Sequence, residues 1–210
     1  GGNEPMYNTA DAALLFINCV YLYFRKTRDT AFVEEMYPEM ERIVKGYMQG
    51  TRFGIHMDTD GLIAAGQGLD QVTWMDVRVG EILPTPRHGK PVEINAYWYN
   101  ALRIMEALGR KAKADGCGPD YGVLAEQVKR SFTEKFWDQE RGCLKDVLPA
   151  MDTKKASVGT DSAHAQDQIR CNQIWAVSLP FTILEPEQEK QVVETVGKSL
   201  YTPLGLRTLD

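Results

Sequence analysis

The fold is decided by residues 9–50, which read TADAALLFINCVYLYFRK, then TRD, then TAFVEEMYPEMERIVKGYMQG. In the last part of this stretch apolar residues recur at steps of three and four: Phe32, Val33, Met36, Met40, Ile43, Val44 and Tyr47. This period places them on one face of an α-helix. The first part is mostly apolar, as in a buried helix, and Thr9 stands at its start as a candidate N-cap. The short link 27–29 therefore predicts an antiparallel pair of helices over 9–26 and 30–50.

The rest of the chain repeats this arrangement of helices and loops. Further helices are predicted over 93–114, 120–137, 172–184 and 186–200. Short extended pieces are predicted over 54–57, 61–64 and 142–147, and 151–168 is a polar loop. Helix pairs that alternate with long loops favour an all-α fold of the α/α-toroid type, with loops at one end forming the site. A solenoid of helix pairs, the alternative, has shorter and more regular loops.

The composition limits the class of protein. The chain has 210 residues, enough for a single domain over 1–210, with 43% hydrophobic and 25% charged residues and a net charge of −5. It has no block of Lys and Arg, which argues against nucleic acid as a partner. The most apolar run, 12–24, is shorter than the roughly 20 residues of a membrane span, which argues against a membrane partner.

The cysteines and histidines give no sign of a metal site. The four cysteines form neither a CxxC pair nor a cluster with histidine, and His56 and His164 lie far from His88 in the sequence. Cys19 and Cys171 stand in apolar, helical surroundings, where buried thiols are expected. We therefore predict a cytoplasmic protein with no metal and no cofactor.

Candidate chemistry gathers in two loop segments, TWMD at 73–76 and TPRHGKPVEINA at 85–96. Trp74 offers an aromatic face for the apolar side of a sugar ring. Two residues later Asp76 offers a carboxyl group, which partial burial beside Trp74 and Met75 suits to general-acid catalysis. The alternative is that Asp76 is an N-cap or forms a loop salt bridge with Arg78 or Arg87.

Other charged residues near these segments have two interpretations each. Glu93 opens a helix, where it stabilises the positive helix end or caps it, or else accepts a sugar hydroxyl or acts as an ion-pair partner for the acid Asp76. Asp11 is a surface residue of the first helical turn or a hydroxyl-binding carboxylate at the floor of a pocket. The basic loop that holds Arg87, His88 and Lys90 binds sugar hydroxyls or holds Asp76 in place, or it is a solvated turn.

Five segments carry a resemblance to a known family: 7–12, 73–76, 85–100, 170–181 and 202–209. Together they resemble the C-terminal amylo-α-1,6-glucosidase domain of glycogen debranching enzymes. The resemblance implies an (α/α)6 toroid and an inverting glycosidase that removes the α-1,6-linked glucose at branch points of an α-glucan such as glycogen or limit dextrin. It implies that Asp76 is the general acid. By analogy with related toroidal glucosidases, Asp11 binds sugar hydroxyls.

The resemblance also implies that the chain is a piece of a larger catalytic domain. An inverting glycosidase needs a second carboxylate roughly 6.5–9.5 Å from the acid. The family's base is a glutamate downstream of a segment like 202–209, whereas this sequence ends at Asp210. We therefore expect a middle part of a toroid, inactive by itself, whose unpaired helix faces favour self-association. The alternatives are a non-catalytic α-glucan-binding module and a toroidal glycosidase that acts on another sugar.

Overall fold

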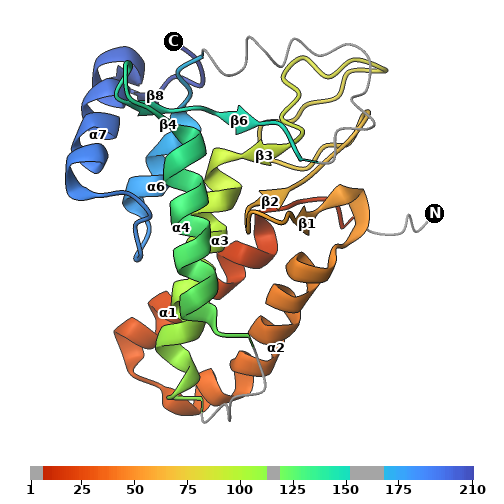
Figure 1. Cartoon of the computed structure of the whole chain (residues 1–210), viewed down its shortest axis with the longest axis vertical. Coiled ribbons are helices and arrows are strands. Elements are labelled where there is room, and N and C mark those ends of the chain that lie inside the picture. The colour runs from red at the N-terminus through yellow and green to blue at the C-terminus, as the bar shows by residue number, and fades with distance from the viewer. Residues whose placement is uncertain (1–6, 113–118, 152–167) are drawn as a thin grey trace.

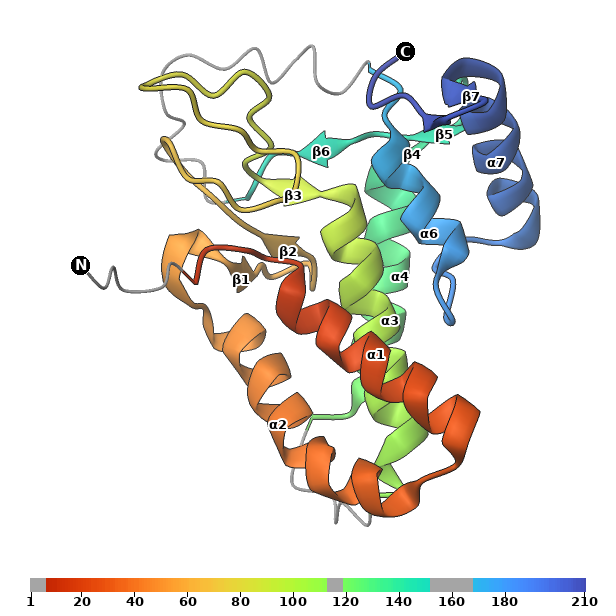
Figure 2. The same cartoon turned by 180° about the vertical axis from the view of Figure 1, so that it is seen from behind.

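A computed structural model describes residues 7–112, 119–151 and 168–210 (Figure 1). The longer helices are α1 (Ala12–Thr27), α2 (Thr30–Gln49), α3 (Val92–Gly109), α4 (Tyr121–Phe136) and α7 (Pro186–Leu200). Shorter helical pieces are α6 (Trp175–Ser178) and the 3-10 turns η1 (Arg52–Gly54) and η3 (Cys171–Ile174). The predicted helix pairs are confirmed for α1 with α2 and for α3 with α4, as the views from both sides show (Figures 1 and 2).

The hairpin of α1 and α2 turns within a short link. Arg28 adopts a left-handed conformation with φ 61°, and its N–H donates to the carbonyl of Phe24, which ends α1. Asp29 then starts α2, because its side chain accepts the N–H of Phe32 as an N-cap. Two opposed caps within two residues thus reverse the chain and set the two helices antiparallel.

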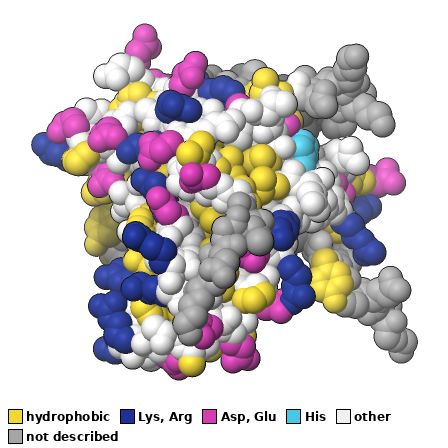
Figure 3. Space-filling model, turned by 60° about the horizontal axis from the view of Figure 1, so that its bottom comes forward, with side chains coloured by type: hydrophobic (Ala, Val, Ile, Leu, Met, Phe, Trp, Pro, Cys, Tyr) yellow, Lys and Arg dark blue, Asp and Glu magenta, His cyan; other side chains and the backbone are white. Residues whose placement is uncertain are grey.

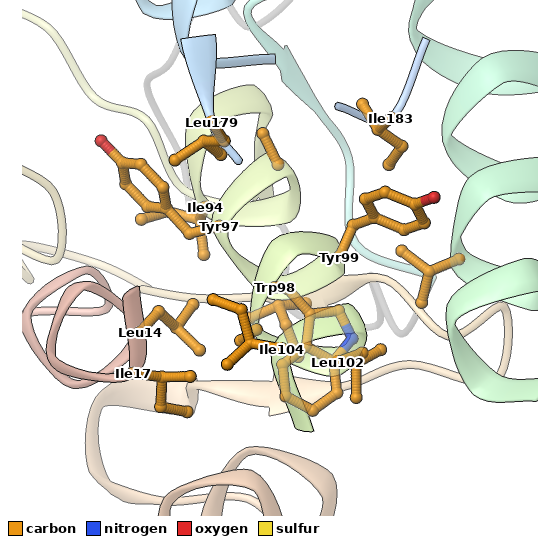
Figure 4. Close-up of a cluster of buried hydrophobic side chains, with 14 of the residues drawn as sticks. Leu14, Ile17, Ile94, Tyr97, Trp98, Tyr99, Leu102, Ile104, Leu179 and Ile183 are labelled. Carbon is orange, nitrogen blue, oxygen red and sulfur yellow. The ribbon is translucent and has the colours of Figure 1, made fainter. Parts of the chain in front are cut away.

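Helix α3 is the centre of the fold. It contacts α1, α2, α4 and α6, and residues 92–102 are buried without interruption. Figure 4 shows buried side chains of α3, which are Ile94, Tyr97, Trp98, Tyr99, Leu102 and Ile104. Around them lie Leu14 and Ile17 of α1, and Leu179 and Ile183 of the segment that follows α6. A helix that is covered on every side carries mostly apolar residues all round. The few polar residues that it buries need hydrogen-bond partners within the protein.

The strands form short two-stranded antiparallel sheets. The pairs are β1 (His56–Met57) with β2 (Ile63–Ala64), β3 (Lys90–Pro91) with β6 (Val147–Leu148), β4 (Trp137–Asp138) with β5 (Cys143–Leu144), and β7 (Tyr201–Thr202) with β8 (Gly205–Leu206). In the second pair Lys90 lies opposite Leu148 and Pro91 opposite Val147. Gly89 permits this approach, since a Cβ there would lie 2.2 Å from the carbonyl oxygen of Leu148.

Several predicted boundaries are wrong. The first helix begins at Ala12, and the residue at its N-cap position is Asp11 rather than Thr9. The third begins one residue early, at Val92, and ends at Gly109 rather than at 114, because the amides of Lys111 and Ala112 both bond to the carbonyl of Leu108 and tighten the last turn.

The helix predicted over 172–184 is also wrong. It is divided into η3, α6 and a non-helical segment, and Leu179 is extended with ψ 158° because Pro180 follows it. Most of the predicted polar loop, residues 152–167, lies outside the described residues.

The described helices include none that is long and apolar enough to cross a membrane. Three described thiols are free, of which Cys143 is buried and Cys171 half-buried. The prediction of a buried Cys19 is wrong, because this residue lies on the exposed side of α1. Because α1 carries apolar residues on all sides, the sequence did not indicate which side of the helix is exposed to solvent. The cytoplasmic location stays a prediction.

Candidate active site

The N-terminal ends of α1 and α3 lie near a long loop over residues 66–89 (Figures 1 and 2). Two bonds tie this loop to the chain that leads into α1. The N–H of Ala10 donates to the carbonyl of Val72 at 2.8 Å, and Asn8 Nδ2 donates to the carbonyl of Gln71 at 2.6 Å. The loop that carries Trp74 and Asp76 is therefore attached to the start of the helix that carries Asp11.

Asp76 closes the loop on itself. Its side chain is buried, and Oδ2 accepts the N–H of Val72 at 3.1 Å and of Thr73 at 2.8 Å. Oδ1 accepts the N–H of Arg87 at 3.1 Å. The carboxylate thus joins the beginning of the loop to its end through backbone amides of the loop, and it is the N-cap of none of the described helices. Its bond to Arg87 runs through the backbone rather than through the guanidinium.

The Arg87 guanidinium lies between two carboxylates. Arg87 and Glu93 are both almost completely buried, and their side chains pair through two parallel bonds, one of them between Nη2 and Oε2 at 2.6 Å. Arg87 also donates two hydrogen bonds to the Asp146 carboxylate, from Nε to Oδ2 at 2.8 Å and from Nη2 to Oδ1 at 3.0 Å. The ion-pair partner of Glu93 is therefore Arg87, rather than the candidate acid Asp76 that the sequence suggested.

Charge and burial act in opposite directions in this cluster. Burial acts to lower the pKa of Arg87, but the charges of Glu93 and Asp146 outweigh it and raise that pKa above its ordinary value. Burial raises the pKa of Glu93, and the adjacent guanidinium opposes the rise. Burial also raises the pKa of Tyr97, and the charges of Glu93 and Asp11 add to the effect, so the phenol stays neutral at physiological pH.

Trp74 is the exposed member of the site, with 53% of its surface open to solvent. The edge of its ring is bonded, because Nε1 donates to Asn172 Oδ1 at 2.9 Å. Asn172 Nδ2 in turn donates to Asp146 Oδ1 at 2.8 Å. A second indole, Trp175 at the start of α6, is 38% exposed and packs edge-to-face on Tyr97 with ring centres 5.2 Å apart.

Lys90 and His88 have partners away from Asp76. The ammonium of Lys90 is buried between Asp58 and Asp60, at 2.8 Å from an oxygen of each. His88 Nε2 donates to the carbonyl of Asp70 at 2.8 Å and so braces the same loop. These contacts give both residues structural roles, and their predicted contacts with sugar hydroxyls stay predictions.

Asp11 is half-buried at the N-cap position of α1, and its side chain makes no capping bond. Its charge helps to raise the pKa values of Tyr47 and Tyr97, after burial of those phenols, so the carboxylate lies near both rings. Among the described residues no three or more His, Cys, Asp or Glu side chains are arranged to hold a metal ion, and the absence of a metal stays a prediction.

Sequence reasoning missed Asp146 and gave Asn172 no role. The available signal for Asp146 was a lone carboxylate between Leu144 and Val147 in a predicted extended piece, because a buried charge needs a partner. That partner, Arg87, lies 59 residues away in the chain. The spacing of residues along the chain does not reveal such a contact.

Comparison with known proteins identifies similar sequences and folds. A family described as amylo-alpha-1,6-glucosidase matches residues 1–210. The glycogen debranching enzyme of Saccharomyces cerevisiae is 25% identical over 198 residues, in a match that covers 82% of this chain and 13% of that enzyme. The chain thus spans only a small part of the length of that relative.

Two solved structures show the fold. A rhamnosidase of Bacillus sp. GL1 matches with a TM-score of 0.66 and 16% identity, over 95% of this chain and 18% of that one. A rhamnosidase from Klebsiella oxytoca with rhamnose bound matches with a TM-score of 0.59 and 16% identity, over 93% of this chain and 32% of that one. The helical, toroid-like fold that the alternation of helix pairs and loops predicted is confirmed.

Proposed function

The chain belongs to the amylo-alpha-1,6-glucosidase family, and from this membership we propose that it acts on an α-glucan, as part of a glycosidase that hydrolyses the α-1,6-linked glucose at branch points with inversion. The observation that carries the proposal is the half-exposed indole of Trp74, held by its edge beside the buried carboxylates of Asp76 and Asp146. An aromatic face next to carboxyl groups suits the apolar side and the reacting bond of a sugar.

In this proposal Asp76 is the general acid and Trp74 stacks on a glucosyl ring. A general acid must hold a proton and present it to the glycosidic oxygen. Both oxygens of Asp76 accept backbone N–H bonds in this structure. Proton transfer therefore requires one of these bonds to open, and Oδ1, which has the single bond to Arg87, is the oxygen that needs the smaller change. Asp11 supports the sugar as a hydroxyl acceptor.

The general base in this proposal comes from outside the 210 residues. Glu93 and Asp146 both direct their carboxylate oxygens at Arg87, and each is almost completely buried. A base must instead hold a water against the anomeric carbon at an open site. We therefore propose that Glu93 orients Arg87 and that these residues form one part of a larger α/α-toroid catalytic domain.

A second candidate function is a non-catalytic α-glucan-binding module. It is favoured by the three backbone N–H groups that donate to the Asp76 carboxylate. These bonds suit a residue that shapes the loop and transfers no proton to the substrate. Trp74 would then bind the glucan in the same way. The two candidates differ in whether the natural protein that carries this sequence releases glucose through Asp76.

The test is glucose release from a phosphorylase limit dextrin by that natural protein and by its Asp76→Asn variant. We expect the variant to lose roughly a hundredfold or more, the usual contribution of a general acid. The matched control is Asp70→Asn, since Asp70 Oδ2 also accepts a backbone N–H of the same loop, that of Gln67 at 3.1 Å. The control should keep most of its activity.

A second substrate separates proton donation from loop shape. Glucosyl fluoride has a leaving group that departs without protonation, so a variant that lacks only the acid retains activity on it. If Asp76→Asn hydrolyses the fluoride well and dextrin poorly, the general-acid role is supported. Equal losses on both substrates would assign Asp76 to loop structure. A natural protein that binds dextrin and releases no glucose would leave the binding module as the function.

A further inference from the structure

The indole of Trp74 is bonded to a chain of side chains that ends inside the protein. Its Nε1 donates to Asn172, Asn172 donates to Asp146, and Asp146 accepts two bonds from Arg87. We propose that Asn172, held by Asp146, is a positioning residue that orients the indole of Trp74 for binding of an α-glucan. The inference rests on the proposed function, in which Trp74 is the sugar platform.

The surroundings of Asn172 leave its amide a single orientation. The oxygen faces the indole N–H, and the NH2 group faces the carboxylate of Asp146. Turning the amide over would set its oxygen against a carboxylate oxygen and its NH2 against the indole N–H, so both bonds would become repulsive. Because Asn172 is 1% exposed, water cannot replace these bonds without opening the site.

The far end of the chain of bonds is rigid. Asp146 and Arg87 are both 2% exposed, and Arg87 is paired with Glu93 in the first turn of α3. The backbone supports the same connection, since the N–H of Val92 donates to the carbonyl of Asp146 at 2.9 Å. The orientation of an exposed ring is thus coupled to the central helix, which lowers the entropy lost when a sugar stacks on it.

The residue next to Trp74 is held by the same group of side chains. The sulfur of Met75 lies 3.2 Å from Arg170 Nη1 and 3.8 Å from Asn172 Nδ2. Asn172 therefore contacts two consecutive residues of the loop, one exposed and one buried. Because Asn172 contacts the side chains of both Trp74 and Met75, it limits movement of the loop backbone between them as well as rotation of the indole.

The first experiment observes the indole N–H resonances of the 210-residue chain by NMR, with that of Trp74 assigned through Trp74→Phe. We expect Asn172→Ala to shift the Trp74 resonance and to speed its hydrogen exchange by tenfold or more. The matched control is Gln139→Ala, because Trp137 Nε1 donates to Gln139 Oε1 at 2.9 Å on the exposed surface. It should shift the Trp137 resonance and leave that of Trp74 in place.

The second experiment is a double-mutant cycle in binding to limit dextrin, measured by affinity electrophoresis. We expect Asn172→Ala to weaken binding by roughly three- to tenfold, the value of one hydrogen bond. If Asn172 acts through Trp74, adding Asn172→Ala to Trp74→Phe costs nothing further. A general structural role for Asn172 predicts instead that the two losses multiply, and that result would overturn the proposal.

The two readouts separate the inference from the proposed function. A Trp74 resonance that Asn172→Ala does not move would overturn the positioning role. If the resonance moves but Trp74→Ala, which removes the aromatic face, binds dextrin as the unmodified chain does, Asn172 holds the ring and the proposed glucan platform is what fails. Should Asn172→Ala not fold, indole exchange in the unmodified chain decides: exchange as fast as in N-acetyltryptophanamide would exclude the bond.

Discussion

At the scale of single residues, Glu93 has the largest expected effect on stability. Glu93→Gln replaces a charge that is fully buried against Arg87 and leaves the guanidinium with Asp146 as its remaining carboxylate. Removal of one partner from a buried ion pair costs about 3–5 kcal/mol, because the other charge stays desolvated. We expect a loss of this size in the free energy of unfolding, measured by urea denaturation.

The control for this prediction lies on the same helix. Glu106 pairs with Arg103 at 2.9 Å, but half of its side chain is exposed. Glu106→Gln should therefore cost less than about 1 kcal/mol. Equal losses for the two variants would mean that burial of the Arg87 cluster contributes nothing to stability.

The residue scale also marks the limit of what the sequence predicts about the site. The segments 73–76 and 85–96 were recognisable because an aromatic, carboxylates and basic residues stand close together in the chain. Asp146 and Asn172 lie in other segments, and they join the site through the pairing of β3 with β6 and through the turn at η3. Contacts that depend on pairing over such separations cannot be read from local spacing.

At the scale of elements, Asn95 connects α3 to the hairpin of β1 and β2. Its Oδ1 accepts the N–H of Ile63 at 2.7 Å, and its Nδ2 donates to the carbonyls of Ile63 at 3.1 Å and Pro91 at 2.9 Å. Asn95→Ala leaves these backbone groups buried without their partner. We expect a loss of about 2–4 kcal/mol in unfolding free energy and faster hydrogen exchange at the amide of Ile63.

An exposed bond to the same hairpin provides the comparison. Gln127 Nε2 on α4 donates to the carbonyl of Thr59 at 3.1 Å in the turn of the hairpin, where water is available. Gln127→Ala should change stability by less than about 1 kcal/mol and leave exchange at Ile63 unchanged. If Asn95→Ala behaved in the same way, the hairpin would be held by apolar packing alone.

Prediction of elements succeeded where local signals were complete. Helix α7 has the predicted bounds, 186–200, because Pro186 stands at its first turn and Glu185 and Gln188 form a capping box. The region 172–184 has a comparable apolar pattern, yet Pro180 requires an extended residue before it and ends α6. Periodicity alone therefore overestimates helix length where a proline interrupts the pattern.

At the scale of the whole molecule, the alternation of helix pairs and loops predicted the fold. The cavities and apolar regions of the surface depend on how the helices pack, which this alternation does not predict. A cavity of about 610 Å³ lies between α1 and α2, lined in part by Phe16, Ile43, Tyr47 and Ile55. Its lining includes neither Arg87 nor Glu93 nor Asp146, and self-association through this open region stays a prediction. On the face in Figure 3 acidic and basic side chains are interspersed around hydrophobic ones.

The ion cluster around Asp60 connects distant parts of the molecule and should make its stability depend on pH. Asp60, in the turn between β1 and β2, pairs with Lys90 on β3 and with Lys135 on α4. Burial alone would raise the pKa of Asp60, but the bonds from Lys135 and Lys90 outweigh it and hold the pKa below its ordinary value; Asp58 behaves alike.

A lowered folded pKa means that the unfolded chain binds protons first as the pH falls. The contribution of Asp60 is therefore complete above the unfolded value of about 3.9 and is lost as the pH falls through the folded value. We expect the Tm of the chain to fall steeply below about pH 4. Asp60→Asn should lower Tm at pH 7 and make the acid slope shallower. Glu106→Gln, at the half-exposed pair with Arg103, should follow the unmodified chain. An unchanged acid slope in Asp60→Asn would contradict the assignment.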